Sequence, residues 1–450
     1  MKNITLFLLC ILLLVGCGPS ESAAPVVEEL EPIEESTDAP EPAEEPTEAP
    51  EPTEGSEPTA ESKPTTDPEP TAEPTEEAVV APEVNFTEGC VDAYDEAVDY
   101  FPQKTTISAA QGFTVEYHNN YKVVTVLTPF SGAEAPAQYV LVQCGTPAPE
   151  SIEDATVIEV PISSIVAMST TYLPALELID RVDALVAVDT GLYASSEAVT
   201  SRIAAGEVTE IGSGAEVNIE MAIELEPDVI MTGASGLPEY DAHPKLQEAG
   251  LTVVLNADYL DATPLGRAEW ADFVALFFNE EAAAEAQYAK VATNYAELAA
   301  LVADVEERPT VFANTPFDGT WYMPGGQGYV AQLLADAGAD YLWAGSEGTN
   351  SLFLDFETVF DTAAAADAWI HIGFFGTLDD LLAADERHAE FAAFQSGSVF
   401  NNDVRTTVNG GNDYYESGAI APDVVLADMI KIFHPELLPD HELVYHRAVE

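Results

Sequence analysis

The chain has 450 residues, with 80 Asp and Glu against 14 Lys and Arg, and its formal net charge is −66. So few basic side chains exclude a protein that binds nucleic acid through its phosphates, because such binding needs a basic surface that releases counterions.

The first 17 residues are typical of a lipoprotein signal peptide. Lys2 supplies a positive start, and residues 6–15 form an apolar run that is too short to span a bilayer comfortably. The run ends in Leu-Val-Gly-Cys, which matches the bacterial lipobox and predicts lipidation of Cys17. An ordinary cleaved signal peptide with a chance cysteine is the alternative. Because two or three acyl chains anchor stably, we expect an extracytoplasmic protein held to the cell membrane, periplasmic if an outer membrane exists.

Residues 18–85 consist of loose repeats of Pro, Glu, Thr and Ala. Few of these residues can enter a core, and the acidic side chains repel one another. We therefore expect a disordered tether that lets the folded body work at a distance from the membrane.

The remaining length, about 360 residues, exceeds a single hydrophobic core and fits two lobes. Beyond the signal peptide and Cys17, only Cys90 and Cys144 remain. An even remainder in a compartment that permits disulfides predicts one bridge between them, with two unpaired structural thiols as the alternative.

Residues 90–160 are a β-rich start to the first lobe. Strand-like runs at 113–118 and 121–127 flank Asn119-Asn120, a pair that suits a tight hairpin. Strands and helices alternate from residue 164 on, which indicates a parallel sheet covered on both faces. The predicted strands are 164–168, 184–188, 229–232 and 251–255, and the predicted helices are 172–179, 219–225 and 243–249.

A helical region over 263–305 separates the N-terminal lobe, 86–262, from the C-terminal lobe, 306–450. Its longer stretch, 280–305, spans about 35–40 Å at 1.5 Å per residue. After Pro309 the alternation resumes, with predicted strands at 310–314 and 369–372 and helices at 329–337 and 423–433. The predicted fold is therefore α/β, with two lobes of parallel sheets flanked by helices, joined by one long helix, and a ligand cleft between the lobes. A single helical crossing predicts a largely pre-formed cleft and small motion.

Several motifs of this body recur in a known family. They are Val160 to Ser169, Asn218-Ile219-Glu220 followed by Leu225 to Ile230, Asp355 to Val359, Gly410 to Glu416, and Pro422 to Asp428. With them, residues 155–445 resemble the ABC-importer binding proteins for iron–siderophore complexes, haem and cobalamin. Many members carry Trp where Tyr415 stands, and the change keeps an aromatic side chain.

This resemblance implies a binding protein, not an enzyme, that delivers an iron chelate or cobalamin-like ligand to an ABC permease and its ATPase. We expect a monomer with no nucleic-acid partner and no cofactor, although the ligand itself can contain iron or cobalt. The ligand's identity stays open among siderophore, haem and cobalamin.

In this family, a glutamate at the start of a helix in each lobe docks onto arginines of the permease. The resemblance assigns that role to Glu220 and Glu357. The alternative is that both are glutamates favoured by the helix macrodipole.

Loops after the predicted strands are expected to line the cleft. The candidates are Ser169, Thr170, Thr171, Tyr172 and Tyr193 in the first lobe, and Trp321, Tyr322, Arg405, Asn412 and Tyr414 in the second. Aromatic side chains with polar tips suit a bulky amphipathic ligand, but core packing is as plausible for any one of them. Arg405 is suited to an anionic ligand group, or to a salt bridge with Asp403 or Asp413.

Other function classes have less support in the sequence. The seven His residues show no HxxH or HxH spacing, so a protein that binds a bare metal ion is the weaker alternative. The chain also lacks a G-x-S-x-G elbow, a Walker loop and a dinucleotide fingerprint. A surface enzyme or sensor on the same scaffold, or a haem scavenger without a transporter, stays open.

Overall fold

The computed structural model describes residues 79–150, 152 and 155–450. The predicted signal peptide, Cys17 and residues 18–78 of the predicted tether lie outside the described residues. In the described part of the chain, no helix is long and apolar enough to cross a membrane.

The β-rich start is a four-stranded sheet with the order β1-β2-β3-β4. Its strands are β1 (Phe113–Tyr117), β2 (Tyr121–Val126), β3 (Ala137–Gln143) and β4 (Thr156–Val160). The first two pairs are antiparallel and β3 pairs with β4 in parallel. Cys90 and Cys144 form a disulfide, which confirms the predicted bridge.

A buried lysine attaches this sheet to the helices that follow. The ammonium of Lys122, on β2, donates to the carbonyl of Leu276 at 2.6 Å, to Asn279 Oδ1 at 2.8 Å and to Glu281 Oε1 at 2.7 Å. Both Lys122 and Glu281 are fully buried. The sheet is therefore held at the start of the long helix by a paired charge that is out of reach of water.

The N-terminal lobe contains a parallel sheet with the order β7-β6-β5-β8-β9. Its strands are β5 (Ile165–Ala167), β6 (Leu185–Val188), β7 (Thr209–Glu210), β8 (Val229–Thr232) and β9 (Val253–Leu255). Its helices are α1 (Leu173–Leu178), α2 (Glu197–Ala205), α3 (Ile219–Glu224) and α4 (His243–Glu248). The central strands are buried along their whole length, as expected when helices cover both faces.

Three helices lead from the first lobe to the second: α5 (Pro264–Ala268), α6 (Trp270–Ala275) and α7 (Glu281–Leu301). Helix α7 belongs to both lobes, since Ala284 packs in the N-terminal core and Tyr295 in the C-terminal core. Its 21 residues span about 30 Å, less than the predicted stretch, because the regular helix ends at Leu301.

The C-terminal lobe contains a sheet with the order β13-β10-β15-β16-β17, parallel except for the last pair. Its strands are β10 (Thr310–Ala313), β13 (Asp340–Tyr341), β15 (Ala368–Ile370), β16 (Val399–Asn401) and β17 (Arg447–Ala448). A small antiparallel sheet joins β11 (Pro316–Phe317), β12 (Thr320–Met323) and β14 (Leu352–Leu354). The helices are α8 (Tyr329–Asp336), α9 (Phe356–Ala363), α10 (Leu378–Ala384), α11 (Ala392–Ser396), α12 (Ser417–Ile420) and α13 (Pro422–Phe433).

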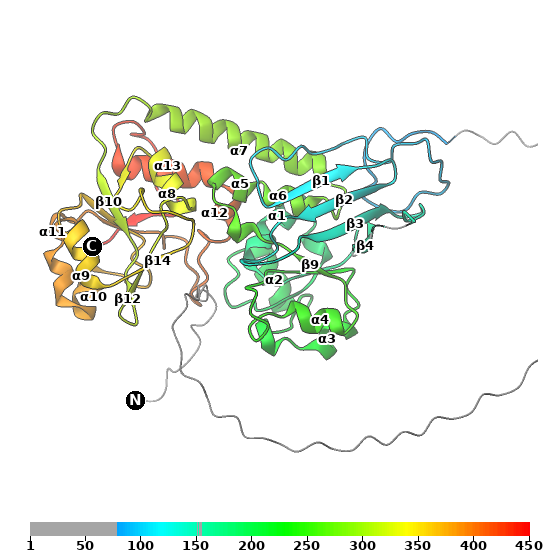
Figure 1. The fold of residues 1–450 in the computed structure, drawn as a ribbon, viewed down its shortest axis with the longest axis horizontal. Helices are drawn as coiled ribbons and strands as arrows, with labels where there is room; N and C mark the ends of the chain where they lie inside the picture. Colours follow the sequence, from blue (N-terminus) through cyan, green and yellow to red (C-terminus); the bar gives the residue numbers. More distant parts are fainter. Residues whose placement is uncertain (1–78, 151, 153–154) are drawn as a thin grey trace, which may run out of the picture. The chain divides into compact units, whose positions relative to one another are not determined.

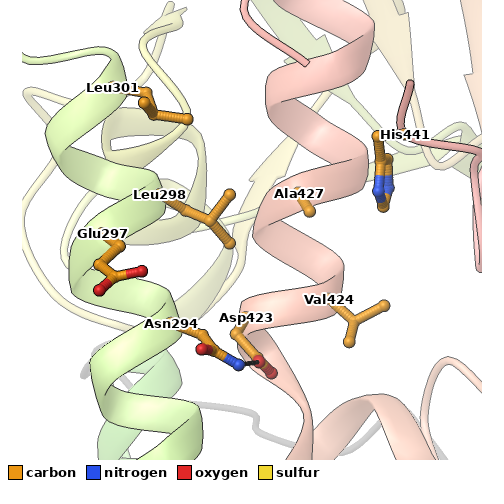
Figure 2. A pocket seen from close by; sticks show the side chains of 8 residues that line it. All are labelled: Asn294, Glu297, Leu298, Leu301, Asp423, Val424, Ala427 and His441. Carbon is orange, nitrogen blue, oxygen red and sulfur yellow. Dashed lines mark hydrogen bonds between the residues drawn. The ribbon is translucent and has the colours of Figure 1, made fainter. Parts of the chain in front are cut away.

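Helix α13 lies beside α7 and fixes the second lobe to the connecting helix (Figure 1). Asn294 Nδ2, on α7, donates to Asp423 Oδ2, on α13, at 2.9 Å, and Leu298 and Ala427 lie between the two helices (Figure 2). The predicted α/β fold, with helix-flanked parallel sheets in two lobes, is confirmed.

Candidate functional site

The order of the N-terminal sheet reverses at β5, whose neighbours β6 and β8 both follow it in the chain. Ligands of such sheets bind outside the carboxyl ends of the strands at this switch point. The residues just after β5 are the predicted Ser169, Thr170 and Thr171, and all three are half-buried. Ser169 Oγ accepts from the Thr171 amide at 3.3 Å and lies 3.0 Å from Thr171 Oγ1, so the side chains are held at the strand end.

The C-terminal sheet has its switch point between β10 and β15. Asn314 and His371 come directly after these strands, and both have positive φ angles, 65° and 56°. Such backbone is uncommon outside glycine and concentrates at functional sites. His371 Nε2 lies 3.1 Å from His446 Nε2. Neither residue was predicted to be part of the site, because both lie inside the predicted strands 310–314 and 369–372.

A small cavity lies where the two lobes meet. It is lined by Thr171, Tyr172, Ala175, Asn256, Asp258, Arg267, Trp270, Ala271, Val274, Ala419 and Ile420. It encloses only about 10 Å³, room for about one water molecule. Ala419 and Ile420 of α12 line this cavity from the second lobe, and the expectation of a largely pre-formed cleft stays a prediction.

Arg267, on α5, is the basic side chain of this cavity. Its Nη2 donates to the carbonyl of Tyr259 at 2.9 Å, and its guanidinium carbon lies 4.5 Å from the centre of the Tyr329 ring. Its Nε is buried without a hydrogen-bond partner. Arg267 was not among the predicted site residues, because in the sequence it is only a basic residue in the segment between the lobes.

A second inter-lobe contact is made by Glu416, just before α12. Its carboxylate accepts from the backbone amides of Ser195 at 2.6 Å and Ser196 at 2.9 Å, at the start of α2 in the other lobe. Glu416 is only 2% exposed, and burial raises its pKa from 4.5 to about 7, with Asp413 and Glu177 adding to the effect. We call this the Glu416 contact.

Gly411 lies next to the same loop of the first lobe. A Cβ atom at this position would collide with the backbone of Tyr193, so the close approach of the two loops requires glycine here. The Glu416 contact and Gly411 together close one side of the space between the lobes.

Some of the exposed apolar side chains lie on segments that follow the parallel strands, while others, such as Leu127, Ile223 and Phe353, lie elsewhere. Tyr193, after β6, is 41% exposed, and Phe374, after β15, is 85% exposed. The others on such segments are Leu192, Tyr240, Tyr259, Phe317, Val404, Val408 and Tyr415. Single exposed apolar residues are ordinary, but a set at the carboxyl ends of both sheets is typical of a binding surface.

The other predicted cleft residues lie in varied surroundings. Trp321 has no exposed surface and packs against Phe312 and Trp369, so it is a core residue that presents nothing to a ligand. Tyr172 is also buried, with its hydroxyl donating to the carbonyl of Asn256 at 3.4 Å. Tyr322 is half-buried against Phe353.

The loop after β16 contains the last three predicted residues. Arg405 is exposed, and its Nε lies 2.7 Å from Asp413 Oδ2, which is the salt bridge considered as its alternative role. Asn412 Nδ2 donates to the carbonyl of Asn402 at 2.9 Å. Tyr414 is buried, with its ring 5.4 Å from that of His371. Tyr414 thus lies near the switch point between β10 and β15, whereas the charge of Arg405 is paired with Asp413.

The two predicted docking glutamates occupy the same position in both lobes. Asn218 caps α3 and Asp355 caps α9, each through its side chain, and Glu220 and Glu357 are the second residues of these helices. Both glutamates are exposed. Glu357 Oε1 lies 3.0 Å from Arg387 Nη1, while no ion pair involves Glu220 among residues 79–150, 152 and 155–450.

Two further features bear on the site. A groove of about 470 Å³ opens between α7 and α13, but its lining includes no residue from the carboxyl end of a strand (Figure 2). Within the described residues, no group of three or more His, Cys, Asp or Glu is arranged to hold a metal ion.

Comparison with known proteins places the chain among binding proteins. Residues 165–405 match the family described as periplasmic binding protein. An uncharacterized lipoprotein of Methanocaldococcus jannaschii is 30% identical over 328 residues, covering 70% of this chain and 80% of its own. A second uncharacterized lipoprotein of that organism is 27% identical over 292 residues, covering 62% of this chain and 67% of its own.

Solved structures with a similar fold include an ABC transporter substrate-binding protein from Listeria monocytogenes EGD-e. It is 16% identical with a TM-score of 0.46, over 61% of this chain and 99% of that chain. A periplasmic heme binding protein from Pseudomonas aeruginosa is 17% identical with a TM-score of 0.46, over 61% of this chain and 93% of that chain.

Proposed function

We propose that this chain, which belongs to the periplasmic binding protein family, is the lipid-anchored solute-binding component of an ABC importer. Its solute is an iron chelate or a cobalamin-like molecule, held between the lobes and passed to the permease without chemical change. The lipobox at Cys17 supports the anchor, and two relatives named as lipoproteins agree with it.

The distribution of apolar surface supports a bulky solute. Exposed aromatic side chains such as Tyr193 and Phe374 stand on strand-end loops of opposite lobes. Rings of this kind offer large contact area to a chelate or a corrin, and nearby hydroxyls and amides can orient it. The inter-lobe cavity beside Arg267 is too small for such a solute, so a solute that enters this cavity needs the lobes to separate and the Glu416 contact to open.

The observation that carries the proposal is the equivalence of Glu220 and Glu357. Each is the exposed second residue of a helix whose N-cap side chain is Asn218 or Asp355, one in each lobe. Two acidic groups on separate lobes fix the orientation of a docked permease and report the separation of the lobes to it. Favourable interaction with the helix macrodipole, the alternative role of these glutamates, does not require one at the same helix position in each lobe.

Substitution of the two glutamates tests the proposal. Glu220→Gln and Glu357→Gln should each reduce uptake of the bound chelate or corrin by cells, while the dissociation constant of the purified chain stays unchanged. Glu224→Gln on α3 and Asp361→Asn on α9 are matched controls, since both residues are exposed on the same helices. Uptake at the wild-type rate in the double Glu220/Glu357 variant would refute docking, and turnover of the bound molecule would identify an enzyme.

A further inference from the structure

Arg267 is a half-buried cation of the inter-lobe cavity that forms no ion pair within the described part of the chain. Lys245, Lys290 and Arg308 form none either, but they are exposed. Lys431 also forms none, and it donates to the carbonyls of Leu438 and Pro439, outside this cavity. Seven other basic residues form ion pairs: Lys104, Lys122, Arg181, Arg202, Arg387, Arg405 and Arg447. Among residues 79–150, 152 and 155–450, no carboxylate oxygen lies within 4.0 Å of the Arg267 guanidinium, which hydrogen-bonds only to backbone carbonyls of Tyr259 and Asp261. A half-buried cation without a counterion is costly, so its retention at an inter-lobe cavity calls for a reason.

The surroundings leave Arg267 free to receive an anion. Its Nε is buried and has no acceptor, and the Tyr329 ring supports its planar face. Asp258 lines the same cavity and forms no ion pair with Arg267; burial raises the pKa of Asp258, and the Arg267 charge opposes this.

Groups from both lobes meet at this point. Thr171 of the first lobe and Ala419 of the second line the same cavity as Arg267. Tyr329 begins α8, and the buried hydroxyl of Tyr414 has no hydrogen-bond partner. An anionic group on Arg267 would therefore lie at the junction of the two lobes.

We infer that Arg267 binds an anionic group of the solute, a carboxylate or phosphate, through charge-assisted hydrogen bonds from its guanidinium. This inference rests on the proposed function and narrows it to negatively charged solutes. It also assigns to Arg267 the contact with an anionic ligand group that the sequence suggested for Arg405.

Equilibrium binding to the purified chain tests the inference with three probes: ferric citrate, which is anionic, ferrioxamine B, which is cationic, and citrate without iron. Titration calorimetry gives the affinities, and Trp270, in the same cavity lining, reports binding by fluorescence. The expected result is that Arg267→Gln weakens the binding of ferric citrate and citrate about 10- to 100-fold, the loss typical of a hydrogen bond to a charged group.

Two further variants complete the design. Arg267→Lys keeps the positive charge but not the planar fork, so it should lose less affinity than Arg267→Gln. Arg405→Gln should bind the anionic probes like the wild type, because Arg405 is exposed and paired with Asp413. Circular dichroism and the melting temperature establish that each variant is folded.

The outcomes separate this inference from the proposed function. If ferrioxamine B binds as well as ferric citrate, or if Arg267→Gln leaves anion binding unchanged, the inference falls and chelate binding stands. If citrate binds through Arg267 but no metal chelate binds, the inference stands and the proposed solute class falls. If no probe binds to the wild type, both fall.

Discussion

The Glu416 contact predicts a defined pH dependence of stability, which replacing Glu416 by Gln should remove. The carboxyl lies between the lobes against the amides of Ser195 and Ser196, nearly out of contact with water. Burial raises its pKa from 4.5 to about 7. At about 1.4 kcal/mol for each pH unit, this pKa difference corresponds to a free energy of at most about 3.5 kcal/mol.

The sign follows from the direction of the pKa. Because the folded chain holds this proton more tightly than the unfolded chain does, the stabilising contribution is complete below pH 4.5 and is lost as the pH rises through about 7. Gln is neutral at every pH and keeps an oxygen that accepts from one of the two amides. The variant should therefore differ least from the wild type at pH 5 and exceed it most at pH 8, by up to about 3.5 kcal/mol.

Denaturant unfolding of the full chain at pH 5, 6, 7 and 8 measures this effect. The useful quantity is the difference in unfolding free energy between variant and wild type, because burial also raises the pKa of Asp272 to about 7 and that of Asp189 to about 6. Glu224→Gln, at an exposed site on α3, should show no such trend. A difference that is constant with pH, or a wild type that is more stable than Glu416→Gln at pH 8, would refute the reasoning.

Three further predictions concern the body of the protein. Lys122→Met leaves Glu281 buried without its cation and should lower the unfolding free energy by about 3–5 kcal/mol. Adding Glu281→Gln removes the unpaired charge and should restore part of this stability. Equal stability of the single and double variants would contradict this prediction. Replacing Cys90 and Cys144 by Ser should cost about 4 kcal/mol, since the bridge joins residues 54 apart, and a denaturant midpoint unchanged from the wild type would exclude it. Trp321→Ala removes a large core side chain and should lower the unfolding free energy, measured with denaturant, by about 3–5 kcal/mol. A variant that keeps its full stability but loses solute affinity would instead identify Trp321 as a ligand contact.

The fold was accessible to sequence reasoning because its signals are local. The alternation of short apolar strands with helices after residue 164 reflects the burial of both sheet faces, and each strand follows from a few consecutive residues. Helix starts were equally readable, because Asn218 and Asp355 cap α3 and α9 within their own segments. The Asn119-Asn120 hairpin between β1 and β2 is a signal of the same kind.

The candidate site was only partly accessible, because its features depend on pairs that are distant in sequence. Arg405 was selected as a basic residue in an acidic chain, but Asp413 satisfies its charge in the folded protein. Trp321 was selected as an aromatic residue after a strand, but the small sheet β11-β12-β14 folds it into the core. The Glu416 contact joins residues about 220 apart, and no local pattern near either partner indicates it.

The sequence by itself determined the two-lobe α/β architecture and the bridge between Cys90 and Cys144, and it predicts export and lipidation at Cys17. Each depends on composition, on periodicity over a few residues or on a count of one residue type. The tertiary structure decided which side chains meet between the lobes: Arg267 forms no ion pair among the described residues and lines a cavity of about 10 Å³, and Glu416 accepts from the amides of Ser195 and Ser196 in the other lobe. Charge pairing and cavity shape depend on side chains that only the folded chain brings together, so neither can be read from neighbours in the sequence.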